Sequence, residues 1–113
     1  MNVVVIQGAL SRPAEERELP SGDRLVALEV STRTPDGVAA TVPVVWIGGP
    51  PCSWDQGEEV VVVGHVRRRW FKTAGATQSR TEVLATHVVL SRQTKRVAQL
   101  LARAAASLDY AAM

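Results

Sequence analysis

Four cationic and two aromatic side chains lie within six consecutive positions of this 113-residue chain. They are Arg67, Arg68, Arg69, Trp70, Phe71 and Lys72. Guanidinium and ammonium groups bind phosphates, and the two rings offer flat surfaces on which bases can stack. Binding of a single nucleic-acid strand without sequence preference needs both, so the stretch indicates a nucleic-acid interface. A second interpretation is an arm that contacts another subunit and packs Trp70 in that contact.

The charge of the chain is unevenly distributed. Residues 1–63 carry four Arg and nine acidic residues, a net −5, whereas residues 64–96 carry eight Lys or Arg and only Glu82 as an acid, a net +7. A concentrated positive block favours a polyanionic partner, although solvated strand faces would give the same count. Arg80 belongs to this block, and Arg33 ends an earlier predicted strand. Both are candidate phosphate contacts.

Patterns typical of catalysis or metal binding do not occur in the sequence. Cys52, His65 and His87 stand alone in separate segments, without the paired spacing of a structural zinc site. There is no Ser-His-Asp order and no Gly-rich phosphate loop. We therefore expect a protein that is not an enzyme and has no metal, no cofactor and no small-molecule substrate.

Valine-rich segments separated by Gly and Pro dominate the first ninety residues and predict β-structure. The predicted strands cover residues 2–7, 24–33, 38–47, 58–70 and 80–90. In the second strand, Val26, Leu28 and Val30 alternate toward a core. Beyond Gly64 both faces of the fourth strand turn cationic, so we expect it to leave the core as a basic arm with a hairpin tip at 73–79. Five evenly spaced strands predict a small barrel or sandwich.

Two tryptophans and a proline allow more specific interpretations. Trp46 shares a strand face with Val42 and Val44, which favours a place in the core. Trp54 lies in a predicted loop, where it either stacks a base or fastens the loop to the barrel. Pro43 cannot donate a ladder hydrogen bond, so it implies an edge position or a bulge.

The hydrophobic period changes near the end of the chain and predicts a helix over residues 93–112. Its stripe consists of Val97, Leu101, Ala104, Leu108 and Ala111, and Leu100 and Ala105 broaden it. Such a stripe must pack against the chain's own barrel or a neighbouring subunit, and we expect Val97, Leu101, Ala104 and Leu108 to contact a partner. A helix that only caps one end of the barrel predicts a monomer instead. We divide the chain into a barrel domain, 1–91, and a helix, 92–113.

Short motifs in the predicted strands follow the order and spacing of a known family. They are residues 2–10 (NVVVIQGAL), 20–22 (PSG), 44–48 (VVWIG), 57–64 (GEEVVVVG), 66–71 (VRRRWF) and 81–83 (TEV). The ordered set resembles the bacterial single-stranded DNA-binding protein family over residues 2–90. The resemblance implies an all-β OB-fold barrel, a five-stranded Greek key, here with a C-terminal α-helix. It also implies a homo-oligomer, a dimer or tetramer, that binds single-stranded DNA in replication, recombination or repair.

The chain departs from that family in its aromatic residues and in its C-terminal region. The family's stacking rings would fall near Asp36, Thr41, Ile47 and Phe71, of which only Phe71 is aromatic here. Each base stacked on a ring contributes about 1–3 kcal/mol, so we expect charge to matter more than stacking. A helix replaces the family's flexible acidic tail, in which respect the chain is similar to the OB-fold primosomal replication protein. The alternative function is therefore a protein-interaction module with weak or lost DNA binding, whose functional surface is the helix.

Together, these observations define a candidate DNA interface and a cellular compartment. The predicted DNA-binding residues are Arg33, Trp54, Arg67, Arg68, Arg69, Trp70, Phe71, Lys72 and Arg80. The longest aliphatic run, residues 60–63, is far shorter than the roughly 20 residues of a membrane helix. Residues 1–6 lack the features of a signal peptide. We expect a cytoplasmic, nucleoid-associated protein without a membrane partner.

Overall fold

The computed structural model describes residues 1–50 and 52–109, which form six strands and one helix. These elements are β1 (Val4–Leu10), β2 (Glu15–Glu18), β3 (Arg24–Arg33), β4 (Ala39–Ile47), β5 (Glu59–Thr73), β6 (Ala76–Leu90) and α1 (Thr94–Asp109). The helix is not long and apolar enough to cross a membrane.

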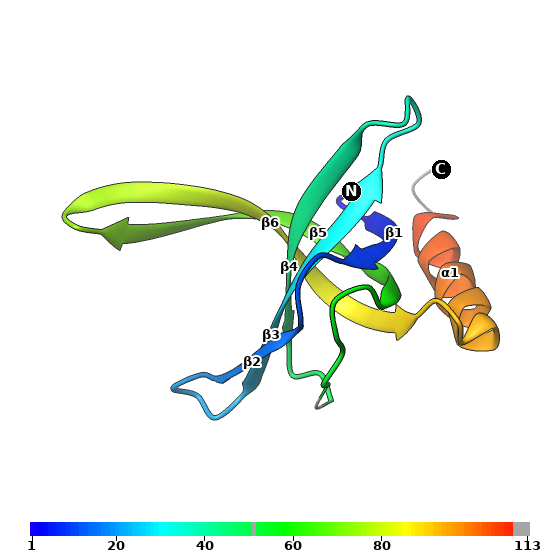
Figure 1. Ribbon diagram of the computed structural model, residues 1–113, viewed down its shortest axis with the longest axis horizontal. Helices are drawn as coiled ribbons and strands as arrows, with labels where there is room; N and C mark the ends of the chain where they lie inside the picture. Colours follow the sequence, from blue (N-terminus) through cyan, green and yellow to red (C-terminus); the bar gives the residue numbers. More distant parts are fainter. Residues whose placement is uncertain (51, 110–113) are drawn as a thin grey trace.

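The strands close into a barrel. Their hydrogen-bonded order is β1-β5-β6-β4-β3-β2, and a further pairing of β1 with β3 at Leu10 and Val30 closes the ring. The pairing of β4 with β6 is parallel and the others are antiparallel. The short β2 pairs only with β3 and lies outside the ring. The predicted five-stranded OB-fold barrel with a C-terminal helix is confirmed (Figure 1).

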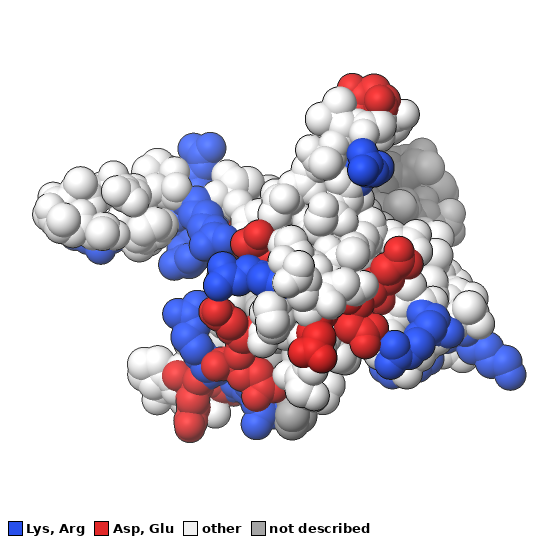
Figure 2. Space-filling view, in the orientation of Figure 1, with Lys and Arg blue, Asp and Glu red and all other residues white. Residues whose placement is uncertain are grey.

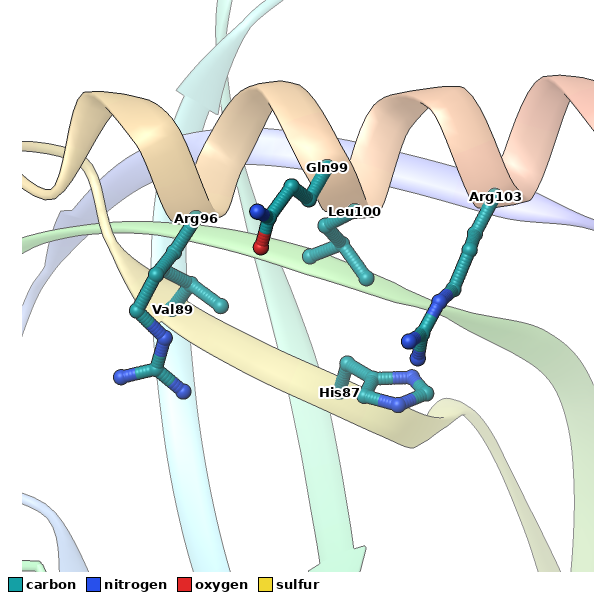
Figure 3. Close-up of a pocket in the computed structure, with 6 residues that line it drawn as sticks. All are labelled: His87, Val89, Arg96, Gln99, Leu100 and Arg103. Atoms are coloured by element: carbon teal, nitrogen blue, oxygen red, sulfur yellow. The ribbon is translucent and has the colours of Figure 1, made fainter.

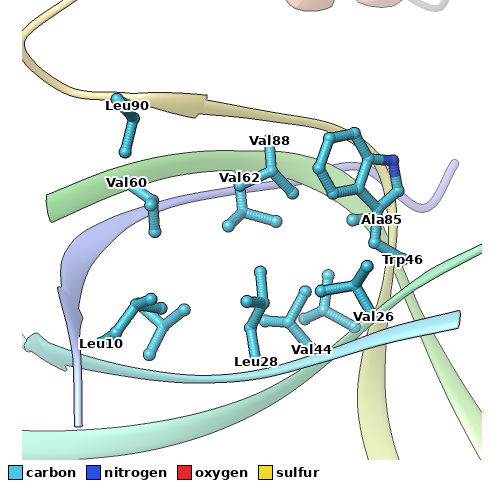
Figure 4. Packing of buried hydrophobic residues seen from close by; sticks show 12 residues of the cluster. Leu10, Val26, Leu28, Val44, Trp46, Val60, Val62, Ala85, Val88 and Leu90 are labelled. Carbon is cyan, nitrogen blue, oxygen red and sulfur yellow. The ribbon is translucent and has the colours of Figure 1, made fainter. Parts of the chain in front are cut away.

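Aliphatic side chains from opposite walls of the barrel meet in its core (Figure 4). Val26, Leu28 and Val30 alternate inward along β3, as predicted, and Trp46 is buried on the inner face of β4. Burial of each such side chain contributes about 1.5–3 kcal/mol, and β-branched Val suits the pleated surface. A fold with few aromatic residues is therefore held by aliphatic packing.

Pro43 lies where β4 has a neighbour on one side only. It is opposite Glu29 of β3, and pairing with β6 begins one residue later, at Val44. The backbone N–H of Ser11 donates a hydrogen bond to the Glu29 carbonyl oxygen. Since the N–H and C=O of a strand residue point to the same side, both backbone groups of Glu29 point away from β4. The nitrogen of Pro43 therefore faces the unpaired side, where no donor is needed. The predicted edge position is confirmed.

The hairpin arm is longer and its turn is tighter than predicted. Strand pairing continues to Thr73 opposite Ala76, so β6 begins four residues before the expected position 80. Ala74 and Gly75 alone form the turn, with φ of 50° and 81°. Positive φ at both positions is typical of a type I′ turn, whose twist matches that of the strands. The expected tip at 73–79 contains this turn but is too long, because Ala-Gly is a weaker turn signal than Asn-Gly.

The helix covers the outer face of β5 and β6 and not an end of the barrel (Figure 1). Leu100 and Ala104 are buried there against Val61, Val63 and Val89, and Val97 packs beside them. The expected placement at one end of the barrel was therefore wrong, while the monomer that this interpretation predicts stays a prediction.

The predicted partner stripe is divided between two faces of α1. Val97 and Ala104 contact the chain's own barrel, which corrects the expectation that they meet a partner. Leu101 and Leu108 remain 41% and 42% exposed. The predicted end of the helix at 110–112, with Ala111, lies outside the described residues. The division arises because Leu100 replaces Leu101 on the packed face, and a one-residue shift rotates a helix by about 100°. A partner contact through Leu101 and Leu108 stays a prediction.

Candidate nucleic-acid interface

The arm, defined as residues 66–83, presents cations on both of its faces. Successive side chains of a strand point to opposite faces, and directly paired residues of an antiparallel ribbon share a face. One face carries Arg67, Arg69 and Phe71 beside Glu82, Arg80 and Gln78. The other carries Val66, Arg68, Trp70 and Lys72 beside Val83, Thr81, Ser79 and Thr77. The arm projects from the barrel (Figure 1), so both faces can meet a ligand.

A buried carboxylate holds two of these guanidinium groups together. Glu82 is only 2% exposed, and its Oε2 accepts hydrogen bonds from Nε of Arg67 at 2.9 Å and Nε of Arg69 at 3.4 Å. Nη2 of Arg67 lies 2.8 Å from the same oxygen. A buried charge persists only when it is paired, so Glu82 fixes both Arg side chains at the base of the arm. Two cations against one anion leave a net positive charge.

Sequence reasoning missed the role of Glu82. The sequence did point to this residue, because Glu82 is the only acid in the basic block of residues 64–96. The decisive information is the hairpin register that places Glu82 opposite Arg67. That register depends on the position of the turn, which was predicted incorrectly.

The aromatic side chains of the arm each lie beneath a guanidinium group. The Arg68 guanidinium carbon is 5.8 Å from the Trp70 ring centroid, and that of Arg69 is 5.2 Å from the Phe71 centroid. Cation–π attraction at these distances orients the rings. Trp70 is 63% exposed, whereas Phe71 is half-buried. Within the single chain, Trp70 thus presents a ring surface to solvent.

A groove runs between the arm and the β2–β3 hairpin. Its largest hollow has a volume of about 430 Å³. The apolar lining comes from outward-facing residues of β3 and β4 and from the β2–β3 turn, namely Leu25, Val45, Ile47 and Leu19. The charged lining consists of Arg67 and Arg69 on one side and Arg17 and Glu18 on the other. Figure 2 shows blue side chains at the base of the arm, facing mixed red and blue ones on the hairpin.

A second hollow continues the groove and brings in Arg80. Arg12, Arg17 and Glu29 line it together with Arg80, although these residues are far apart in the sequence. Arg12 is paired with Glu15 at 3.1 Å and with Glu29 at 3.9 Å. Sequence reasoning missed Arg12 and Arg17 because they belong to the acidic region of residues 1–63. Only closure of the barrel places them beside the arm.

Arg33 and Trp54, two predicted DNA-binding residues, lie outside the arm and groove linings. Nη1 of Arg33 donates to the Gly37 carbonyl at 2.8 Å in the β3–β4 turn, which projects in a different direction from the arm (Figure 1). Trp54 is half-buried and stacks on Trp46, with centroids 6.3 Å apart and ring planes at 23°. This contact favours the interpretation that Trp54 fastens its loop to the barrel. DNA contacts by both residues stay predictions.

Two titratable groups outside the groove have shifted pKa values. Hydrogen bonds from the Thr34 hydroxyl and the Val38 amide lower the pKa of Asp36. The same hydrogen bonds stabilise the β3–β4 turn. Burial raises the pKa of the Cys52 thiol, and nearby Glu16 adds to this effect, so the unreactive thiol form is favoured. Over residues 1–50 and 52–109, no three His, Cys, Asp or Glu side chains gather where they could hold a metal ion.

Comparison of the chain with protein-family models and with curated proteins found no match. A proposal for the function therefore rests on the chemistry of the arm and the groove.

Proposed function

We propose that the protein is a non-catalytic single-stranded DNA-binding protein of replication, recombination or repair, related to the family that its sequence resembles. The observation that carries this proposal is the arm: a projecting ribbon with cations on both faces and a Trp70 ring that is 63% exposed. Single strands bind to such combinations of positive charge and stacking surface.

The groove gives the strand a path with two kinds of surface. Arg67, Arg69 and Arg80 line the path and can meet phosphates, since the guanidinium fork matches phosphate oxygens. Val45 and Ile47 offer an apolar floor to the bases. Phe71 shares a ribbon face with Arg69 and can stack a base at the end of the path, while Trp70 serves the opposite face.

Electrostatics should dominate the affinity. Each neutralised phosphate of a single strand contributes about −0.7 to the slope of log affinity against log salt concentration. Arg68, Lys72 and Arg80 have no ion-pair partner within the described part of the chain, so they are available to phosphates. The acidic side chains of the β2–β3 hairpin oppose binding, and because salt screens this repulsion they make the salt dependence less steep.

A fluorescence titration with poly-dT at low salt tests the proposal. Trp46 and Trp54 are packed against each other, so quenching should come mainly from Trp70. We expect quenching at micromolar protein, loss of most of it in Trp70→Phe, and release of the DNA as salt is added. Arg92→Gln removes one exposed cation that pairs with Glu58 away from the groove, so it should keep the quenching and the affinity of the wild type. No binding by the wild-type protein at low salt would refute the proposal.

Exposed leucines on α1 favour the second candidate, a protein-interaction module. Leu101 and Leu108 leave an apolar surface on the outer side of the helix, which is consistent with the expected homo-oligomer. Deleting the helix is a poor test, since it would expose Val61, Val63 and Val89. Leu101→Gln with Leu108→Gln keeps the packed face intact. Loss of assembly on sizing without loss of DNA binding would assign these residues to a partner contact.

A further inference from the structure

We infer that a second pocket, between α1 and β6, binds a phosphate group. The pocket has a volume of about 160 Å³ and lies on the outer side of the barrel (Figure 3). It is lined by His87, Val89, Arg96, Gln99, Leu100 and Arg103. These residues have no part in the groove described above.

Helix geometry brings the polar groups of the pocket together. Arg96, Gln99 and Arg103 are spaced three and four residues apart, so they project from one face of α1. Leu100, between them, is buried against β5 and β6 and fixes this face toward the strands. Figure 3 shows Arg103 extending toward the His87 ring and Arg96 extending beside Val89. Two guanidinium forks therefore flank a hollow with an apolar floor.

The charge of the pocket is uncompensated. None of its six lining residues is acidic, and neither Arg96 nor Arg103 pairs with an acid among residues 1–50 and 52–108. The first turn of α1 also lacks an acidic residue and carries Lys95 and Arg96, although cations are unfavourable at that end of the helix dipole. An anion held between the two Arg side chains would offset this repulsion.

A hydroxyl group orients the imidazole at the edge of the pocket. Thr86 donates its hydroxyl hydrogen to the Val63 carbonyl at 3.0 Å. The same oxygen lies 3.2 Å from Nδ1 of His87, and this contact orients the ring. His87 is therefore a well-placed reporter of a ligand in the pocket.

The pocket shares a ribbon face with the arginines of the groove. The outward-facing side of β5 and β6 carries three successive pairs of residues, namely Arg67/Glu82, His65/Leu84 and Val63/His87. His87 comes five positions after Glu82 on β6, a distance of about 17 Å in an extended strand. Resting on the proposed function, we assign the phosphate to the backbone of a strand that continues from the groove toward α1.

Nuclear magnetic resonance with inorganic phosphate tests the pocket without DNA. Millimolar phosphate, against chloride of equal ionic strength, should shift the His87 ring and Arg103 side-chain resonances. The double variant Arg96→Gln with Arg103→Gln should weaken this binding at least tenfold. Lys95→Gln, which removes a neighbouring cation outside the pocket, should leave it nearly unchanged. Absence of the shifts in the wild type, or their persistence in the double variant, would overturn the inference.

Oligo-dT of two lengths tests the source of the phosphate. The double variant should bind a strand of about eight nucleotides as the wild type does, because that length suffices for one OB fold. It should bind a several-fold longer strand roughly tenfold more weakly, with a salt slope reduced by about 0.7, the value for one lost phosphate contact. An unchanged long-strand affinity alongside phosphate binding would assign the pocket to free phosphate and refute the DNA path. If the wild type binds no DNA, the proposed function fails while the phosphate titration still decides the pocket.

Discussion

The β5–β6 ribbon contains two regions that share the same strands and differ in what their side chains contact. In the barrel region, Val60 and Val62 face the core, while Val61 and Val63 face α1. In the arm, beyond Gly64, the same alternation places cations on both faces. One continuous pair of strands can therefore stabilise the fold at one end and present a charged surface at the other. Substitutions in the two regions should separate stability from binding.

The largest expected effect is an exception to this comparison, at the base of the arm. Arg67→Gln with Arg69→Gln should lower the free energy of unfolding by about 3–5 kcal/mol, because Glu82 would remain buried without a cation. Adding Glu82→Gln should restore most of that loss, which urea denaturation measures. The triple variant should still bind poly-dT more weakly than the wild type. A stable double variant would show that Glu82 reaches solvent.

Gly64 lies at the boundary between the two regions, at a register shift in the ribbon. A Cβ there would collide with the Leu84 carbonyl oxygen and the Ala85 backbone. Gly64→Ala should therefore destabilise the protein by about 3 kcal/mol, the upper end for overpacking, since backbone yields less than a side chain. Ala85→Gly, a change of the same size on the facing strand, is a useful comparison, and urea midpoints measure both. Equal stability of Gly64→Ala and the wild type would mean that the strands can separate at this point.

Substitution of Trp70 should change DNA affinity and leave stability nearly unchanged, the reverse of what we expect for the barrel residues. Trp70→Ala should weaken poly-dT binding by about 2 kcal/mol, the value of one stacked base, and change stability by less than about 0.5 kcal/mol. Its salt slope should stay close to that of the wild type, because no phosphate contact is lost. Anisotropy of a labelled oligonucleotide measures the affinity without relying on tryptophan. A large stability loss would instead place Trp70 in a subunit contact.

Arg68 is the most selective probe of charge on the arm. It has no acidic partner within the described residues, so Arg68→Gln should leave stability unchanged. The salt slope should fall by about 0.7, with a several-fold loss of affinity at low salt. Arg24→Gln, whose side chain pairs with Glu16, is the control for a general change in net charge. Equal effects of the two variants would mean that Arg68 makes no direct phosphate contact.

The accuracy of the sequence predictions differs between the same two regions. Inward-facing residues such as Val26, Leu28 and Trp46 were predicted because burial on one face imposes a period of two. The exposed arm was predicted because its strand loses that aliphatic pattern after Gly64. The position of the hairpin turn was missed, since cationic and polar residues on both faces leave the register without a hydrophobic signal.

The arrangement of α1 and of the groove shows a different limit. The helix was predicted from its period, but the choice between Leu100 and Leu101 for the packed face depends on the shape of the barrel surface. Arg12 and Arg17 were assigned to an acidic region, yet they line the groove with Arg80. Local pattern carries no information on which distant segments become neighbours.

The amino-acid sequence by itself determined the strand-rich barrel, the projecting basic arm and the terminal helix, because hydrophobic period and charge are local properties of the chain. The tertiary structure alone decided the ion-pair cluster of Glu82, the groove beside β2 and the pocket beneath α1. Each of these depends on strand register or barrel closure. Both are set by the summed packing of residues far apart in the chain.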